Sequence, residues 1–214
     1  MSTSSAPRRG RLPRELRERR RVEVIGAARK ELVERGAAGL TMEGVARRAG
    51  ASKETLYAWF GTRDDLVGAV IEASADDSAQ RVEAALATDA STLDDAHDTL
   101  AAYAESLLRL LTSEPSVSLN RAAMTSAALS DRLLQSGRQR IGPVVERYLA
   151  QLDAHGILRV PDPEEAYRTL FGLVVRDTQI RVLLGDPPPP ADAIRDEAKR
   201  AVDAFLALHV STRG

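Results

Sequence analysis

The sequence predicts an all-α protein with two functional parts. Aromatic residues make up 4% of its 214 residues, alternating runs of Val, Ile and Thr are absent, and nearly every long segment carries apolar residues at helical spacing. The formal net charge of −1 hides a division, because residues 1–63 hold 15 basic and 7 acidic residues, a net +8, whereas residues 64–214 hold 15 basic and 24 acidic residues, a net −9. We therefore expect an N-terminal part that meets an anion and a larger part that does not.

Composition excludes several classes of protein. The chain has no cysteine, which excludes disulfides, thiolate zinc sites and thiol nucleophiles and fits a reducing compartment. The longest apolar run of the C-terminal half, 171–175, is too short to span a membrane. Residues 1–10 are rich in Ser and Arg and lack the apolar segment of a secretory signal. We expect a cytoplasmic protein with no membrane partner.

Catalytic and metal-binding motifs are also missing from the sequence. His97, His155 and His209 are far apart and show no metal-ligand spacing. The sequence contains neither a G-x-S-x-G nucleophile elbow nor a glycine-rich phosphate loop. We therefore expect no metal, no cofactor and no enzymatic activity.

The N-terminal elements follow from turn and capping residues. Residues 1–13 are dominated by Ser, Pro, Gly and Arg, which predicts a flexible arm. A first helix is predicted over 14–35, with Gly36 as its left-handed cap. A second helix is predicted over 41–49, ended by Gly50. The expected apolar stripe of the first helix consists of Val22, Ile25, Ala28 and Leu32.

The next elements continue this punctuation. Ser52 is expected to cap a short helix over 53–60, which Gly61 ends. Thr62 and Asp65 form a capping box in front of a long fourth helix. Proline excludes a helix over 187–190 and predicts a stiff spacer there. Further helices are expected over 93–111, 117–129, 131–154, 163–184 and 191–209.

The short helices at the basic end fit a helix-turn-helix unit. That geometry needs a small residue where its two helices cross and a glycine in the tight turn. Ala46 and Gly50, four residues apart, meet both requirements. The inward contacts would come from Val45, Ala49, Ala51 and Leu56.

The stretch 41–66, TMEGVARRAGASKETLYAWFGTRDDL, resembles the DNA-binding domain of TetR-family transcriptional regulators. The resemblance implies a helix-turn-helix DNA-binding domain over 14–62 and a helical ligand-binding and dimerisation domain over 63–214. It implies a sequence-specific regulator, either a repressor, which is the commoner function in the family, or an activator. A repressor would leave its palindromic operator when a small-molecule effector binds.

The resemblance also assigns DNA contacts to individual residues. Hydroxyls and cations suit phosphate oxygens, and short polar side chains at the start of a recognition helix suit base edges. Two departures from the family pattern, Glu54 and Ala58, leave the operator sequence open. The resemblance implies phosphate contacts from Thr41, Tyr57, Trp59 and Arg63, and base contacts from Ser52, Lys53 and Thr55. The arginines of the arm either follow the minor groove or belong to a solvated tail.

The C-terminal part gives less specific signals. The family implies an effector pocket, and the candidate lining residues are Tyr103, Met124, Tyr148 and Arg176, which alternatively point to solvent or pair across the bundle. The last two helices carry more apolar surface than one core needs, and the resemblance implies that they form the four-helix interface of an isologous homodimer. The expected interface residues are Leu170, Leu173, Val174, Val202 and Phe205. Such a dimer would present its recognition helices to half-sites roughly 34 to 36 Å apart.

Two other classes remain open at the level of sequence. A helical protein-interaction module could keep the motif without binding DNA. An enzyme on a helical bundle would need a catalytic carboxylate pair brought together by folding.

Overall fold

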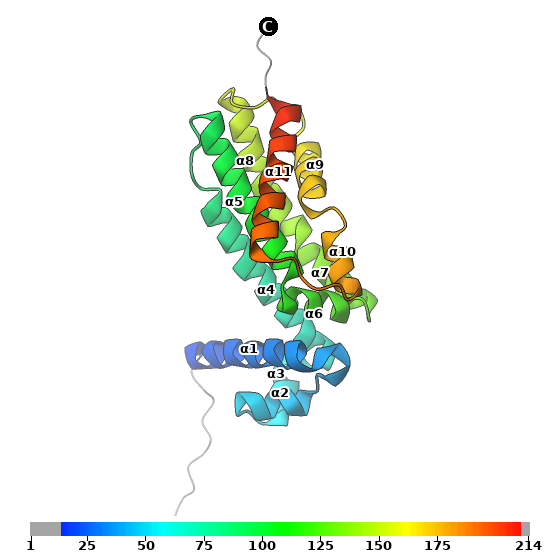
Figure 1. Cartoon of the computed structure of the whole chain (residues 1–214). Coiled ribbons are helices and arrows are strands. Elements are labelled where there is room, and N and C mark those ends of the chain that lie inside the picture. Colours follow the sequence, from blue (N-terminus) through cyan, green and yellow to red (C-terminus); the bar gives the residue numbers. More distant parts are fainter. Residues whose placement is uncertain (1–13, 211–214) are drawn as a thin grey trace, which may run out of the picture.

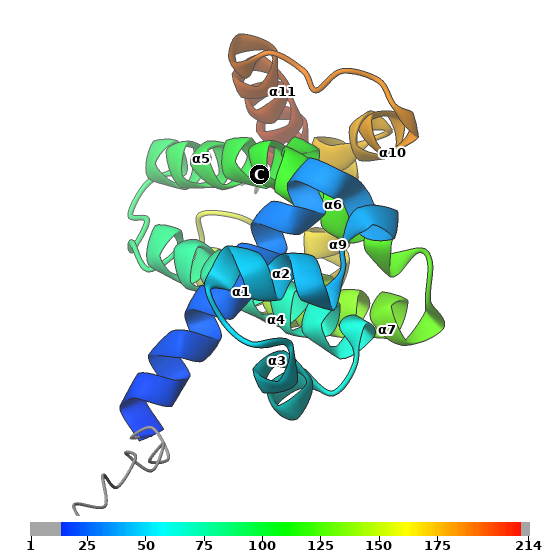
Figure 2. The same ribbon diagram turned by 90° about the horizontal axis from the view of Figure 1, so that it is seen from below.

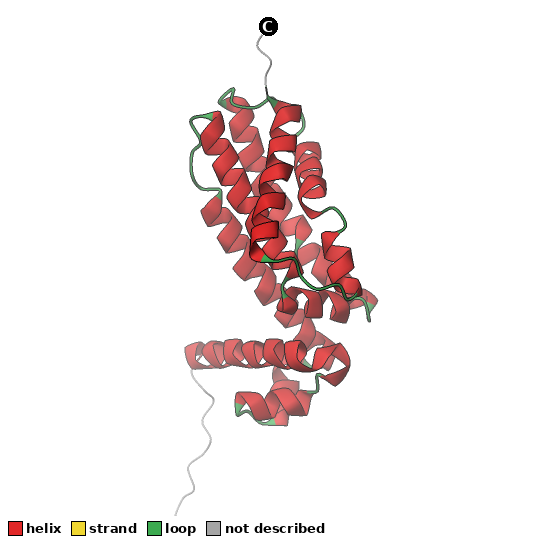
Figure 3. Ribbon diagram, in the orientation of Figure 1, coloured by secondary structure: helices red, strands yellow, loops and turns green. Residues whose placement is uncertain are grey.

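The computed structural model describes residues 14–210, and those residues form helices joined by short loops (Figures 1 and 3). No strand occurs in this range, so the all-α prediction is confirmed. The predicted arm, 1–13, lies outside the described residues. None of the helices within 14–210 combines the length and the apolar character that a bilayer span requires. The helices are α1 (Arg14–Gly39), α2 (Met42–Ala49), α3 (Lys53–Phe60), α4 (Arg63–Ala85), α5 (Leu93–Thr112), α6 (Glu114–Ala123), α7 (Ala127–Ser136), α8 (Arg138–Ala154), α9 (Pro163–Val175), α10 (Thr178–Leu184) and α11 (Ala191–His209).

Helices α1 to α3 form one end of the molecule, which we call the head, and α5 to α11 form the body. Helices α2 and α3 lie on the far side of α1 from the body (Figure 1), and α4 joins the two parts. The predicted caps are present: the Thr41 hydroxyl accepts the Gly44 amide at 3.0 Å, and Gly50 is left-handed at φ 59°. Gly36 has φ 66° and ψ 179°, which is not helical, so the regular part of α1 ends where it was predicted to end, and a short turn up to Gly39 follows this kink.

The core of the head is shared with the body. Buried side chains of α1, α2, α3 and the first half of α4 form one cluster, which also includes Leu119 and Ala122 of α6 and Leu129 of α7. Val22, expected in the apolar stripe of α1, is 69% exposed, and the first turns of α1 project beyond the other helices of the head (Figure 2). Helices α6 and α7 therefore complete the apolar core under α1 and α4, so the head and the body share this core.

A second cluster forms the core of the body. It is built mainly from α5, α8, α9 and α11, which run alongside one another (Figure 1). Tyr103, Tyr148, Leu170 and Phe205 are each at most 2% exposed within it. Helix α11 begins after the proline spacer, which is not helical, as predicted.

Three predicted helices have different bounds in the structure. The helix expected over 117–129 begins earlier, because Ser113 caps it and Pro115 occupies its first turn, and it ends at Ala123. The helix expected over 131–154 is divided at Gly137 into α7 and α8. The helix expected over 163–184 breaks at Arg176, whose φ is 45°.

Candidate nucleic-acid interface

The N-terminus of α3 presents a cluster of short polar side chains to solvent. The Ser52 hydroxyl accepts the Thr55 amide at 3.2 Å and lies 2.9 Å from the Thr55 hydroxyl. Ser52 and Lys53 are exposed, and Thr55 is half-buried. The structure thus brings together the three residues predicted to contact bases, at the end of a helix whose free amides favour anions.

Glu54, the unusual residue of this helix, is occupied locally. Hydrogen bonds from its own backbone amide and from the Ser52 hydroxyl, together with the neighbouring Lys53 charge, lower the pKa of Glu54. A carboxylate held at the helix N-terminus complements the helix dipole. This capping role accounts for an acidic side chain on a surface that is otherwise suited to an anion.

The aromatic residues of α3 divide between surface and core. Tyr57 is 47% exposed, and the Lys53 ammonium lies 6.0 Å from its ring centroid. Phe60 is buried, as predicted, and the Arg21 guanidinium lies 4.9 Å from its ring centroid. Trp59 is half-buried against the head core, so only part of its indole is available to a phosphate.

Arg63, expected on a phosphate, is engaged inside the protein. Its guanidinium donates to the Leu40 carbonyl at 3.1 Å, to the Ala37 carbonyl, and to Asp64 at 3.0 Å. These bonds tie the start of α4 to the loop between α1 and α2. The guanidinium uses three of its five N–H donors in these bonds, so Arg63 holds this loop in place, and its phosphate contact stays a prediction.

Arg20 was not predicted to have a role, yet it braces the turn of the helix-turn-helix. One guanidinium nitrogen donates to the carbonyls of Ala49 and Gly50, at 2.7 Å each. The partners are about thirty residues away in sequence, so no local pattern reveals the contact.

Two further residues of the helix-turn-helix face solvent on the same part of the molecule. Thr41 caps α2 and Arg47 lies within it, and both are exposed.

Two family models match the chain. Residues 24–70 match the bacterial regulatory proteins of the tetR family, and residues 98–209 match the C-terminal domain of AefR-like transcriptional repressors. The second match alone covers more than half of the chain. The chain belongs to the TetR family of transcriptional regulators.

Solved structures agree with this assignment. A TetR transcriptional regulator from Agrobacterium tumefaciens is 36% identical, with coverage of 91% of this chain and 96% of the other and a TM-score of 0.77. A TetR-family regulator from Mesorhizobium loti shares the fold at 23% identity, with 94% and 100% coverage and a TM-score of 0.83. FadR from Bacillus subtilis, solved with stearoyl-CoA, shares it at 16% identity, with 87% and 97% coverage and a TM-score of 0.69. No curated protein sequence matches the TetR-family chain described here.

The predicted effector-pocket residues of this TetR-family regulator do not converge on one site. Tyr103 and Tyr148 are buried in the body core, where burial raises the pKa of Tyr148. Met124 lies at the end of α6 and is 65% exposed. The Arg176 side chain is also 65% exposed and pairs with Glu197 at 2.9 Å. For Met124 and Arg176 the alternative noted from sequence, a surface position, is the one observed.

The predicted dimer-interface residues require a correction. Leu170, Val174, Val202 and Phe205 are each 0% exposed, because they pack inside the protomer. Their side chains therefore cannot meet a partner, and the prediction is wrong for these four. Leu173 alone is half-buried. Apolar periodicity correctly identified residues on the buried faces of α9 and α11. These faces pack in the core of the protomer and not against a partner, as had been predicted.

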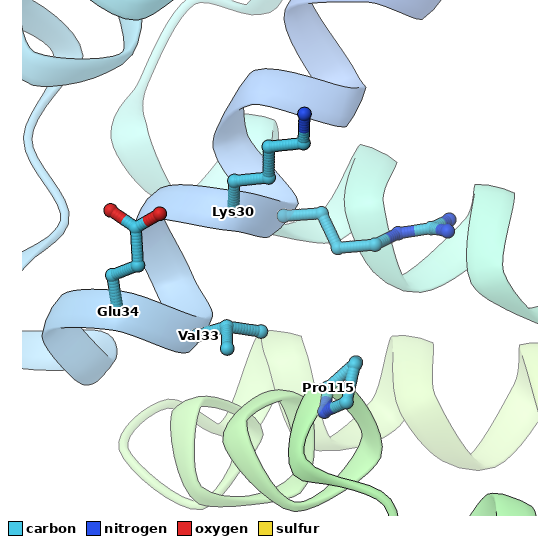
Figure 4. A pocket seen from close by; sticks show the side chains of 5 residues that line it. Lys30, Val33, Glu34 and Pro115 are labelled. Carbon is cyan, nitrogen blue, oxygen red and sulfur yellow. The ribbon is translucent and has the colours of Figure 1, made fainter.

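A surface groove of about 250 Å³ lies where the head meets the body. Figure 4 shows Val33 of α1 facing Pro115 of α6, with Lys30 and Glu34 on the α1 side. Arg29 completes the lining. None of the residues predicted to line an effector pocket belongs to this groove.

Proposed function

We propose that the chain is a sequence-specific DNA-binding repressor. The observation that carries this proposal is the exposed N-terminal end of α3, where Ser52, Lys53 and Thr55 lie together in the part of the chain, residues 1–63, that has a net charge of +8. Helix α3 is the second helix of the helix-turn-helix, the element that enters the major groove in this architecture. Residues 14–62 would bind DNA, and residues 63–214 would bind a small molecule and a second copy of the chain.

Release by a small-molecule effector is the proposed regulation. FadR, which shares the fold, was solved with stearoyl-CoA, and the C-terminal match is described as that of a repressor. The C-terminal match supports repression over activation, and the FadR complex supports a small-molecule effector. The regulator would act in the cytoplasm, on a palindromic operator that matches the two-fold symmetry of a homodimer.

The outer faces of α9 and α11 are the surface we propose for that homodimer. Their inner faces are taken up by the protomer core, but small and apolar residues remain exposed on the outside. On α11, Ala204 and Leu208 are one turn apart, and Gly172 is exposed on α9. Small residues on exposed helix faces let two helices approach closely when two protomers pack in an isologous arrangement.

Selection of genomic fragments by the purified chain tests the proposed function. We expect enrichment of fragments that share an inverted repeat, and a mobility shift for each of them. Lys53→Ala and Thr55→Ala should relax the sequence preference, because these side chains lie where base edges would be contacted. If no fragment is enriched, the chain is better explained as a helical interaction module that keeps the motif without binding DNA.

A further inference from the structure

The carboxylate of Asp65 bonds to the turn after α3 with one oxygen and to the body with the other. Oδ2 accepts the Thr62 hydroxyl at 2.6 Å and the Thr62 amide at 3.3 Å. Oδ1 accepts the Arg132 guanidinium of α7 at 3.1 Å. Thr62 directly follows Gly61, which caps the C-terminal end of α3. A single side chain therefore links the turn after the recognition helix to a helix of the body.

Gly68 leaves the space that the Arg132 side chain occupies where it crosses α4. It lies in the interior of α4, where glycine costs helix stability and needs a reason. A Cβ at this position would lie 2.9 Å from Arg132 Cδ and would overlap the guanidinium. The Arg132 side chain thus crosses α4 directly over Gly68. Beyond the crossing, the other guanidinium nitrogen lies 3.8 Å from Glu72, one turn further along α4 from Gly68.

Apolar packing already holds α7 against the head, so Arg132 is not needed to attach α7 there. Leu129 is buried in the head core, and Leu133 packs against it. The side chains of Arg132 and Asp65 are 38% and 42% exposed, and exposed ion pairs contribute little to stability. What the pair can do is fix the position of α7 relative to the turn after α3, because both oxygens of Asp65 are committed.

We propose that Arg132 is a positioning residue for DNA binding, which acts through Asp65 on the turn that ends the recognition helix. The inference rests on the proposed function of α3. The hydrogen bonds from Thr62 and the charge of Arg132 lower the pKa of Asp65, so the link is intact at neutral pH. A displacement of α7 in the body would then reach α3 through Arg132, Asp65 and Thr62 in turn.

Hydrogen exchange and DNA binding of the full-length chain test this link. The variants are Arg132→Gln, which removes the charge, and Gly68→Ala, which blocks the path while favouring the helix. Arg140→Gln is the matched control. Arg140 of α8 also pairs with an aspartate of α4, Asp76, but this residue lies three turns after Asp65 and so away from the turn that follows α3. We expect amides of residues 61–66 to exchange roughly two- to fivefold faster in both test variants and at the wild-type rate in the control.

The DNA measurement separates positioning from direct contact. Arg132→Gln and Gly68→Ala should raise the dissociation constant for a selected fragment by roughly two- to fivefold with an unchanged salt slope. Arg132→Lys should restore part of the protection, and Gly68→Ala should not lower Tm. Unchanged exchange over 61–66 in the test variants, or a reduced salt slope, would overturn the link. If wild-type protein binds no duplex, the proposed function fails, while the exchange result still decides whether α7 and the turn are coupled.

Discussion

Arg63 shows how a residue type can be right for one task and be used for another. A cation at the start of the fourth helix suits a phosphate, but the guanidinium donates to the carbonyls of Ala37 and Leu40. Those carbonyls belong to the end of α1 and the loop that follows it, where helices leave acceptors unsatisfied. Arg63 therefore stabilises the frame that supports α2 and α3.

Arg63→Ala is expected to destabilise the chain by about 1 kcal/mol, because charge-assisted bonds to two carbonyls are lost from a side chain that is 35% exposed. Urea denaturation measures the change. Arg47→Ala is the matched control: it also removes an arginine from the head, but from an exposed position. Equal stability losses for the two variants would contradict the loop-holding role.

The residues that sequence analysis did not assign are those whose partners lie far along the chain. Glu31 is 3% exposed and pairs with Arg48 of α2 at 2.8 Å, a contact that spans seventeen residues. Arg20 likewise reaches the turn at Gly50. By contrast, the capping bonds of Ser52, Thr62 and Asp65 join groups three residues apart, which is why these capping roles could be predicted.

At the scale of elements, capping residues set the helix starts, and the cap of α5 makes its start sensitive to acid. The amides of Ser91 and Thr92 donate to Asp95 at 3.0 and 2.9 Å at the start of α5. Hydrogen bonds from the Thr92 side chain, then from the Ser91 and Thr92 amides, lower the pKa of Asp95. A lowered pKa in the folded state means that the carboxylate stabilises the fold above its unfolded pKa of about 3.9, and that this contribution is lost as the pH falls through the folded value.

Asp95→Asn should therefore be less stable than wild type at pH 7, and the difference should shrink as the pH falls below about 3.9 and through the lowered folded pKa of Asp95. The free energy of unfolding, measured by denaturant titration at a series of pH values, checks this. A difference between the two proteins that stays constant over that range would show that the charge of Asp95 does not support α5.

Helix breaks were the least predictable elements. Gly36, Gly50 and Gly61 have positive φ, and glycine there gave usable signals. Arg176 has φ 45°, a conformation that a long side chain rarely adopts. Its guanidinium pairs with Glu197 of α11, so a tertiary contact accompanies this break. No glycine or proline beside Arg176 marks the break in the sequence. The division at 176 was therefore missed.

At the scale of the whole molecule, the proposed homodimer depends on the outer faces of α9 and α11. Ala204→Arg places a charged side chain on that surface and should shift the protein from dimer to monomer in sedimentation equilibrium, because a buried charge without a partner is costly. Ala84→Arg, at an exposed alanine of α4, is the matched control and should leave the mass unchanged. An Ala204→Arg protein with the mass of wild type would place the interface elsewhere.

The division of charge also belongs to this scale. The net charge of −1 combines +8 on residues 1–63 with −9 on the remainder, and Figure 1 places the head at one end of the molecule. We expect the acidic body to disfavour non-specific binding of DNA phosphates to the rest of the surface. Interaction with DNA is therefore expected to be confined to the head.

The salt dependence of DNA binding tests whether the head binds DNA through contacts with its phosphates. The measurement is the dissociation constant for a selected fragment, by fluorescence anisotropy, between about 50 and 200 mM KCl. We predict that the logarithm of the association constant falls linearly with the logarithm of the salt concentration, with a slope of about −0.9 for each phosphate contacted. Tyr57→Ala should bind more weakly than wild type at every salt concentration. Absence of binding to any duplex, or an affinity that does not change with salt, would contradict it.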